Sequence, residues 1–123
     1  MILVDTSVWI DHLRTENSAL LRLLDRGAAL IHPFVIGELS LGHLQHRRTV
    51  LETLSLLPQA VVASHEETLT FIDRHRLFGM GIGYVDAHLL GATCLTPGAA
   101  LWTLDQRLAF AADRVGIRAN FVV

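Results

Sequence analysis

Four carboxylates stand in local contexts that suit a shared metal-binding site. Asp5 and Asp105 each follow a short apolar run typical of a buried strand, whereas Glu38 and Asp86 lie in apolar helical segments. Sites in open α/β sheets collect at the carboxyl ends of strands, so these acids are expected to meet there. Gathered carboxylates repel one another unless a cation joins them or some are protonated. We therefore expect a hard cation that prefers oxygen ligands, Mg²⁺ or Mn²⁺.

Each acid also has a structural explanation when it is considered alone. Asp5 and Asp105 precede probable helix starts, where an aspartate can cap the helix or face its dipole. Glu38 and Asp86 are harder to explain in this way, because an unpaired carboxylate is costly to bury on an apolar helix. Buried acids usually indicate pairing or metal ligation, and this favours a common purpose for the four.

The segments that position these acids alternate between strand and helix patterns. This alternation predicts an α/β domain over residues 1–123, with a mostly parallel sheet and helices on both faces. The four to five expected strands are Ile2–Val4, Ala28–Ile31, Ala60–Val62, Ala100–Leu104 and, at an edge, Arg118–Val122. Helices are expected from Thr6 or Ser7, from Asn17 to Gly27, and over Pro33–Leu44, Arg48–Leu56, Ser64–Leu77, Tyr84–Leu95 and Gln106–Val115.

Composition limits the class of protein. The chain is 51% hydrophobic, which is ample for a core, but it has no apolar stretch near 18 residues, so we expect no membrane span. The single cysteine, Cys94, excludes an internal disulfide and makes the cytoplasm the expected compartment. A net charge of −2 argues against bulk nucleic-acid binding, although a local basic path stays open.

Other residues carry weaker signals for chemistry. The glycine-rich segment 79–83 follows a helix rather than a strand, so it does not fit a dinucleotide-binding loop. His88 lies two residues after Asp86 and therefore points to another side of the same helix. Ser7 lacks a histidine partner pattern for nucleophilic catalysis. The basic cluster at residues 74–76 is either a solvated helix face or a contact to an RNA backbone.

Four segments occur in a specific order along the chain: DTSVWID, VIGELSLG, GIGYVDAHLL and TLDQRL. With them, the whole chain resembles the PIN-domain ribonucleases, in particular the VapC-type toxins of toxin–antitoxin modules. The resemblance implies a parallel sheet with strand order 3-2-1-4-5. It also implies that the family's acidic quartet corresponds to Asp5, Glu38, Asp86 and Asp105, with Thr6 and Thr103 as neighbouring hydroxyl groups.

The resemblance further implies a metal-dependent endoribonuclease that acts as a toxin and uses a metal-activated water to hydrolyse RNA. Its expected partners are an RNA substrate such as tRNA or rRNA, a cognate antitoxin and a second copy of the chain. Glu38 is either a metal ligand or the residue that orients the attacking water. The next acid after Asp105 is Asp113, so the number of metal ions, one or two, stays open.

Two alternatives remain at this stage: an RNA-processing PIN nuclease without an antitoxin, and a catalytically silent α/β binding module. An antitoxin helix is expected to bind in an apolar groove. We expect this groove on the helices that carry Trp9, Leu13, Leu20 and Leu24, and on those that carry Val50, Leu51 and Leu54.

Overall fold

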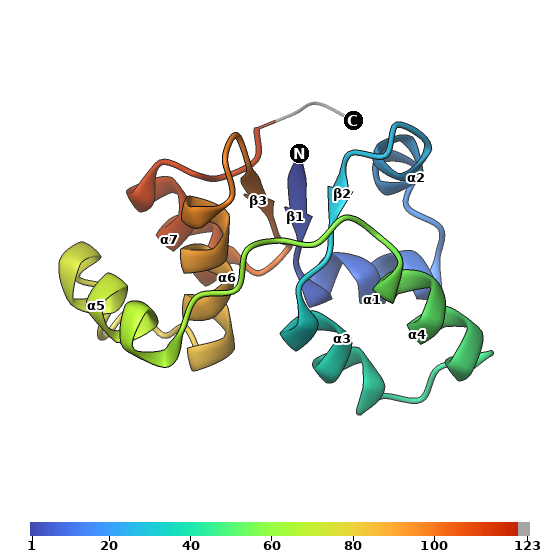
Figure 1. Ribbon diagram of the computed structural model, residues 1–123. Coiled ribbons are helices and arrows are strands. Elements are labelled where there is room, and N and C mark those ends of the chain that lie inside the picture. Colours follow the sequence, from blue (N-terminus) through green and yellow to red (C-terminus); the bar gives the residue numbers. More distant parts are fainter. Residues whose placement is uncertain (121–123) are drawn as a thin grey trace.

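Three short parallel strands form the centre of the molecule. The computed structural model describes residues 1–120, in which strands β1 (Ile2–Val4), β2 (Ala29–Leu30) and β3 (Ala100–Trp102) lie in the order β2-β1-β3 (Figure 1). Both neighbours run parallel to β1, with Leu3 opposite Leu30 on one side and Leu101 on the other. The predicted α/β class with a parallel sheet is confirmed.

The described residues form three strands rather than the expected four or five. The predicted strand at 60–62 is reduced to one parallel bridge between Ile31 and Gln59. The Ala60 amide donates to the Ile31 carbonyl at 2.9 Å, and the pairing goes no further because the neighbouring chain enters a helix at Pro33. Val61 and Val62 are also about half exposed, at 45% and 49%, so little apolar burial favours a longer strand.

The described part of the predicted edge strand over 118–122 forms a bridge rather than a named strand. Leu101 of β3 forms a single parallel bridge with Arg118, and the predicted positions Phe121 and Val122 lie outside the described residues. The two bridges extend the sheet on its outer sides, one next to β2 and one next to β3. The lateral order therefore follows the expected 3-2-1-4-5, with the outermost positions shortened to bridges.

Seven helices surround the sheet in the part of the chain that the structure describes. They are α1 (Thr6–Arg14), α2 (Ser18–Asp25), α3 (Pro33–Ser40), α4 (Arg47–Ser55), α5 (His65–His75), α6 (Tyr84–Leu95) and α7 (Gln106–Val115). Figure 1 shows α5, α6 and α7 towards the β3 edge of the sheet, and α1 to α4 towards the β2 edge. None of these helices is both long and apolar enough to cross a membrane.

Local sequence signals explain most helix boundaries. Ser64 and Glu67 form the expected capping box at the start of α5, and Asn17 caps α2. Helix α3 ends at Ser40, about one turn before the predicted end at Leu44. Leu41 is 89% exposed and contributes no packing, and the flexible Gly42 follows it, so nothing favours another turn.

Helix α6 is the most deeply buried helix and anchors one of the four acids. Its residues from Ala87 to Thr93 are all buried, and Leu89 and Leu90 join Leu3 and Leu101 of the sheet in the core. Burial on all sides fixes the position of the helix, and with it the position of Asp86 in its first turn.

Candidate active site

The topology brings Asp5 and Asp105 to the same edge of the sheet. Asp5 directly follows β1 and caps α1, whereas Asp105 lies three residues after β3 and caps α7. Because β1 and β3 are neighbouring parallel strands, their carboxyl ends lie side by side. The Asp5 amide donates to the Trp102 carbonyl at 2.9 Å, which continues the strand pairing up to the site.

Asp5 is buried and held by two hydroxyl groups. Its carboxylate Oδ2 accepts hydrogen bonds from Ser7 Oγ at 2.6 Å and from Thr103 Oγ1 at 2.7 Å. These two hydroxyls lie 3.2 Å apart, and Ser7 Oγ also accepts from the Leu104 amide at 3.0 Å. All the side-chain hydrogen bonds of Asp5 in the described structure end on Oδ2, which leaves Oδ1 available for another ligand.

Asp105, like Asp5, uses one carboxylate oxygen for its hydrogen bonds and leaves the other available. Its Oδ1 accepts from the Arg107 and Leu108 amides at 2.9 and 3.1 Å, which caps α7. Its own amide donates to Thr103 Oγ1 at 3.0 Å. Thr103 therefore connects Asp105 with Asp5, in agreement with the neighbouring role that the family resemblance implied for this threonine.

Glu38 and Asp86 come from the helices on either side of these strands. Glu38 is exposed on α3, and its Oε1 accepts a 2.6 Å hydrogen bond from Thr6 Oγ1 in the first turn of α1. Asp86 is half-buried in the first turn of α6, where its Oδ2 accepts from the Gly83 amide at 3.0 Å. Glu38 and Asp86 are thus each oriented by one hydrogen bond, which involves one of the two carboxylate oxygens.

The electrostatics of Asp86 link all four acids. Burial raises the pKa of Asp86, the hydrogen bond from the Gly83 amide opposes this rise, and the negative charges of Asp5, Asp105 and Glu38 raise the pKa further. The charges of the other three sequence-predicted acids therefore reach Asp86. A cation bound among them would relieve this repulsion and favour ionised Asp86.

The arrangement fits a water-rich metal ion better than a closed metal cage. Within residues 1–120, no three acid, histidine or cysteine side chains lie close enough together to form a ready-made metal cluster. Mg²⁺ is usually held by one or two carboxylates and keeps several of its waters. The chemistry of the donors, all of them carboxylate oxygens, fits such a hard ion.

Sequence reasoning missed the role of Ser7. The sequence suggests Ser7 as a helix start or, less well, as a nucleophile. In the structure its hydroxyl instead donates to Asp5 after β1 and contacts Thr103 and Leu104 after β3. These partners are almost one hundred positions apart in sequence, at separations of 96 and 97. The sequence shows that a hydroxyl residue stands in the first turn of α1. Its hydrogen-bond partners could not be predicted without the strand order.

His32 and His88 lie near each other, with their ring centroids 6.3 Å apart. His88 is buried, with Nε2 2.9 Å from the Tyr84 hydroxyl and Nδ1 3.3 Å from the Thr68 hydroxyl. His32 is fully buried, and its Nδ1 accepts from the Phe34 amide at 3.0 Å to cap α3. His88 therefore serves packing and hydrogen bonding in α6, the structural alternative to a catalytic role.

Burial of His32 predicts a loss of stability in mild acid. Desolvation and the nearby His88 lower the pKa of His32 from 6.5 to about 4. Between pH 6.5 and pH 4 the unfolded chain therefore takes up a proton at His32 that the folded chain does not, so stability falls as pH falls. From pH 7 to pH 5 this contribution amounts to about 2 kcal/mol.

The His32→Asn variant tests this expectation, because asparagine keeps an acceptor for the Phe34 amide but does not titrate. Urea denaturation of both proteins at pH 7 and pH 5 should show a smaller acid-induced loss of unfolding free energy in the variant. Equal losses in the two proteins would contradict the assigned role of His32.

Comparisons with known proteins agree with this geometry. The family model described as "PIN domain" matches residues 2–113. Ribonuclease VapC32 of Mycobacterium tuberculosis, from two strains, is 50% identical to this chain over 117 residues, which cover 95% of this chain and 94% of the relative. The match and the coverage confirm the resemblance seen in the four sequence segments. The chain belongs to the PIN-domain family and, within it, to the VapC-type proteins.

Proposed function

We propose that the chain is a metal-dependent endoribonuclease that acts as the toxin of a toxin–antitoxin pair. The observation that carries this proposal is the coupling of Asp86 to Asp5, Asp105 and Glu38 at the carboxyl end of the parallel sheet. The ribonuclease name of the 50% identical relative supports the same activity. A silent binding module does not require a half-buried carboxylate whose pKa is raised by three further acids, so the enzyme is favoured.

The four acids have different proposed tasks. Asp5, Asp86 and Asp105 hold the ion directly or through water, and Glu38 is a further ligand or orients the attacking water. The ion we propose is Mg²⁺, with Mn²⁺ able to substitute, and when bound it polarises the phosphoryl oxygen and lowers the pKa of a water molecule. Thr6 fixes Glu38, while Ser7 and Thr103 fix Asp5 through Oδ2, so that Oδ1 would be the oxygen available to hold the ion.

The substrate we propose is RNA, such as tRNA or rRNA, cut by one PIN-like domain over residues 1–123 that works as a homodimer. Purified protein incubated with cellular RNA and Mg²⁺ should give discrete fragments on a denaturing gel. Intact RNA under these conditions would contradict the proposed activity. Light scattering during gel filtration measures the oligomeric state separately.

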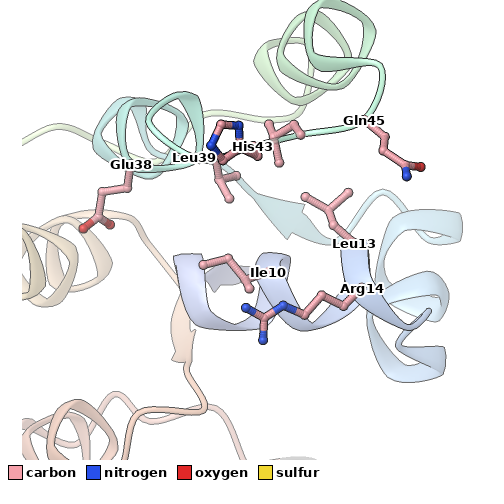
Figure 2. A pocket seen from close by; sticks show the side chains of 9 residues that line it. Ile10, Leu13, Arg14, Glu38, Leu39, His43 and Gln45 are labelled. Atoms are coloured by element: carbon pink, nitrogen blue, oxygen red, sulfur yellow. The ribbon is translucent and has the colours of Figure 1, made fainter.

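A pocket that includes Glu38 in its lining is the proposed antitoxin site. This cavity of about 560 Å³ lies between α1 and α3, where Ile10 and Leu13 face Leu39, and Glu38 stands at one end (Figure 2). An antitoxin helix seated here could place an arginine on Glu38 and so compete with the metal. The remaining lining residues are Arg14, Gly42, His43, Leu44 and Gln45.

The groove differs in part from the sequence prediction. Trp9, Leu20 and Leu54 were expected to line it, but they are only 2%, 0% and 6% exposed and belong to the core. Leu13, which is 41% exposed, was predicted correctly as a pocket residue. The helical pattern identified apolar faces but could not distinguish the face that covers the sheet from the face that stays open.

Replacing Leu13 with glutamate should weaken antitoxin binding by about 30-fold or more, as expected for a central apolar contact worth at least 2 kcal/mol. The test is copurification with the small protein encoded beside this chain, together with relief of growth arrest. Leu56→Glu is the matched control, because Leu56 is 86% exposed and does not line the pocket. Equal copurification of both variants would place the antitoxin elsewhere.

A further inference from the structure

Helix α7 presents an exposed stripe of two arginines and one phenylalanine. Arg107, Phe110 and Arg114 are spaced i, i+3 and i+7, which places them on one side of the helix. All three are exposed, and Phe110 exposes 57% of its surface. Together with Gln106 and Met80 they line a cavity of about 340 Å³ between α7 and the glycine-rich loop.

Arg107 lies close to Asp105 in sequence and packs against the loop that precedes Asp86. It follows Asp105 by two residues, and its side chain lies against Gly81, where an added Cβ would be 2.9 Å from Nη1. Gly81 also has a φ of +77°, a conformation that glycine adopts without strain. The loop that contains Gly81 continues into α6 and Asp86, so this guanidinium group borders the acidic site.

The positive charges of the stripe are not neutralised within the described part of the chain. There, the only ion pair joins Arg118 to Asp113, whereas Arg114 donates from Nη1 to the Met80 sulfur at 3.9 Å. The guanidinium groups of Arg107 and Arg114 form no ion pair with a carboxylate in residues 1–120. A polyanion could therefore pair with both side chains without displacing an existing partner.

The proposed function requires positive charge near the acids, and the two arginines of the stripe supply it. The chain has a net charge of −2 and gathers four acids at one place, so a phosphate backbone that approaches them is repelled. Arginine forks match phosphate oxygens, and an exposed aromatic ring offers a surface for a stacked base. Both features lie on the helix that starts at Asp105.

We propose that this stripe is a track for single-stranded RNA, in which Arg107 and Arg114 bind phosphates and Phe110 stacks on a base. The inference rests on the proposed nuclease function. A protein partner is disfavoured because it would have to supply acids to match the two arginines, whereas every RNA supplies phosphates. The α1–α3 pocket lies towards the opposite edge of the sheet, so the two surfaces are separate (Figure 1).

The test measures the binding of a fluorescein-labelled single-stranded RNA of mixed sequence, by anisotropy, to protein that carries Asp86→Asn to prevent cutting. Adding Arg107→Gln or Arg114→Gln should each reduce the steepness of the log–log dependence of binding on salt by about 0.7, the value for one lost phosphate contact on a single strand. Phe110→Leu should weaken binding roughly 5- to 150-fold without changing that steepness. A purely structural role would not alter the salt dependence.

Arg22→Gln is the matched control, since Arg22 is exposed on α2 beside β2, at the other edge of the sheet. An unchanged salt dependence in both α7 arginine variants, or equal effects in the control, would overturn the RNA track. The RNA track would also be overturned if these variants bind RNA normally but no longer bind the antitoxin or a second copy of the chain. The stripe would then be a protein interface. Failure of the wild-type chain to cut RNA at all would instead refute the proposed function.

Discussion

Asparagine in place of Asp86 should leave the protein folded and lower its rate of RNA cleavage by about 1,000-fold or more, because the lost metal-ligand charge is worth several kcal/mol in the transition state. Asp86 is the acid whose pKa reflects burial and the charges of the other three. Cleavage rates of the wild type and the variant with Mg²⁺ measure the effect. Cleavage by the variant at the wild-type rate would show that Asp86 is not an active-site residue.

The stability of the same variant separates catalysis from folding. Burial and repulsion raise the pKa of Asp86, so its ionised form destabilises the metal-free protein at neutral pH. Asparagine removes this charge and can still accept from the Gly83 amide, so the free energy of unfolding without metal should hold or rise. Asp25→Asn, at the exposed end of α2, is the matched control and should retain wild-type cleavage.

Removal of divalent metal should have an equally large effect on the wild-type protein. Activity should fall to background in excess EDTA and return with added Mg²⁺ or Mn²⁺, because the four acids alone repel the phosphate of the substrate. Thermal stability should respond as well, since a cation bound among the acids stabilises the folded state by mass action. Cleavage that persists in excess chelator would exclude the carboxylate-and-metal mechanism.

The positions of the acids could be predicted because each one has a local signature in the sequence. Asp5 and Asp105 end apolar runs and start helices, and both cap helices in the structure. Asp86 was conspicuous as an acid inside an apolar helix. The geometry that joins them depends on the pairing of β1 with β3, which brings together residues almost one hundred positions apart. The roles of Ser7 and Thr103 as supports of Asp5 follow from that pairing.

Strand lengths and exposed faces were harder to predict, because tertiary contacts decide them. Residues Ala60–Val62 have a strand-like sequence, but the pairing is limited to a bridge at Gln59 because the neighbouring chain enters α3 at Pro33. Trp9 has the same apolar character as Leu13 but faces the core, while Leu13 faces the pocket. Periodicity shows that a helix has an apolar side but not what covers it.

Mass spectrometry of the RNA ends gives the most direct test of cleavage by a carboxylate-held metal and water. Attack by water from outside the RNA leaves a 5′-phosphate and a 3′-hydroxyl, and it does not need the ribose 2′-hydroxyl as nucleophile. A histidine-based ribonuclease would use that hydroxyl and leave a 2′,3′-cyclic phosphate, but His32 and His88 are buried, and burial lowers the pKa of both. We therefore predict 5′-phosphate and 3′-hydroxyl ends on every fragment. Cyclic-phosphate ends would contradict the mechanism even if the protein cuts RNA.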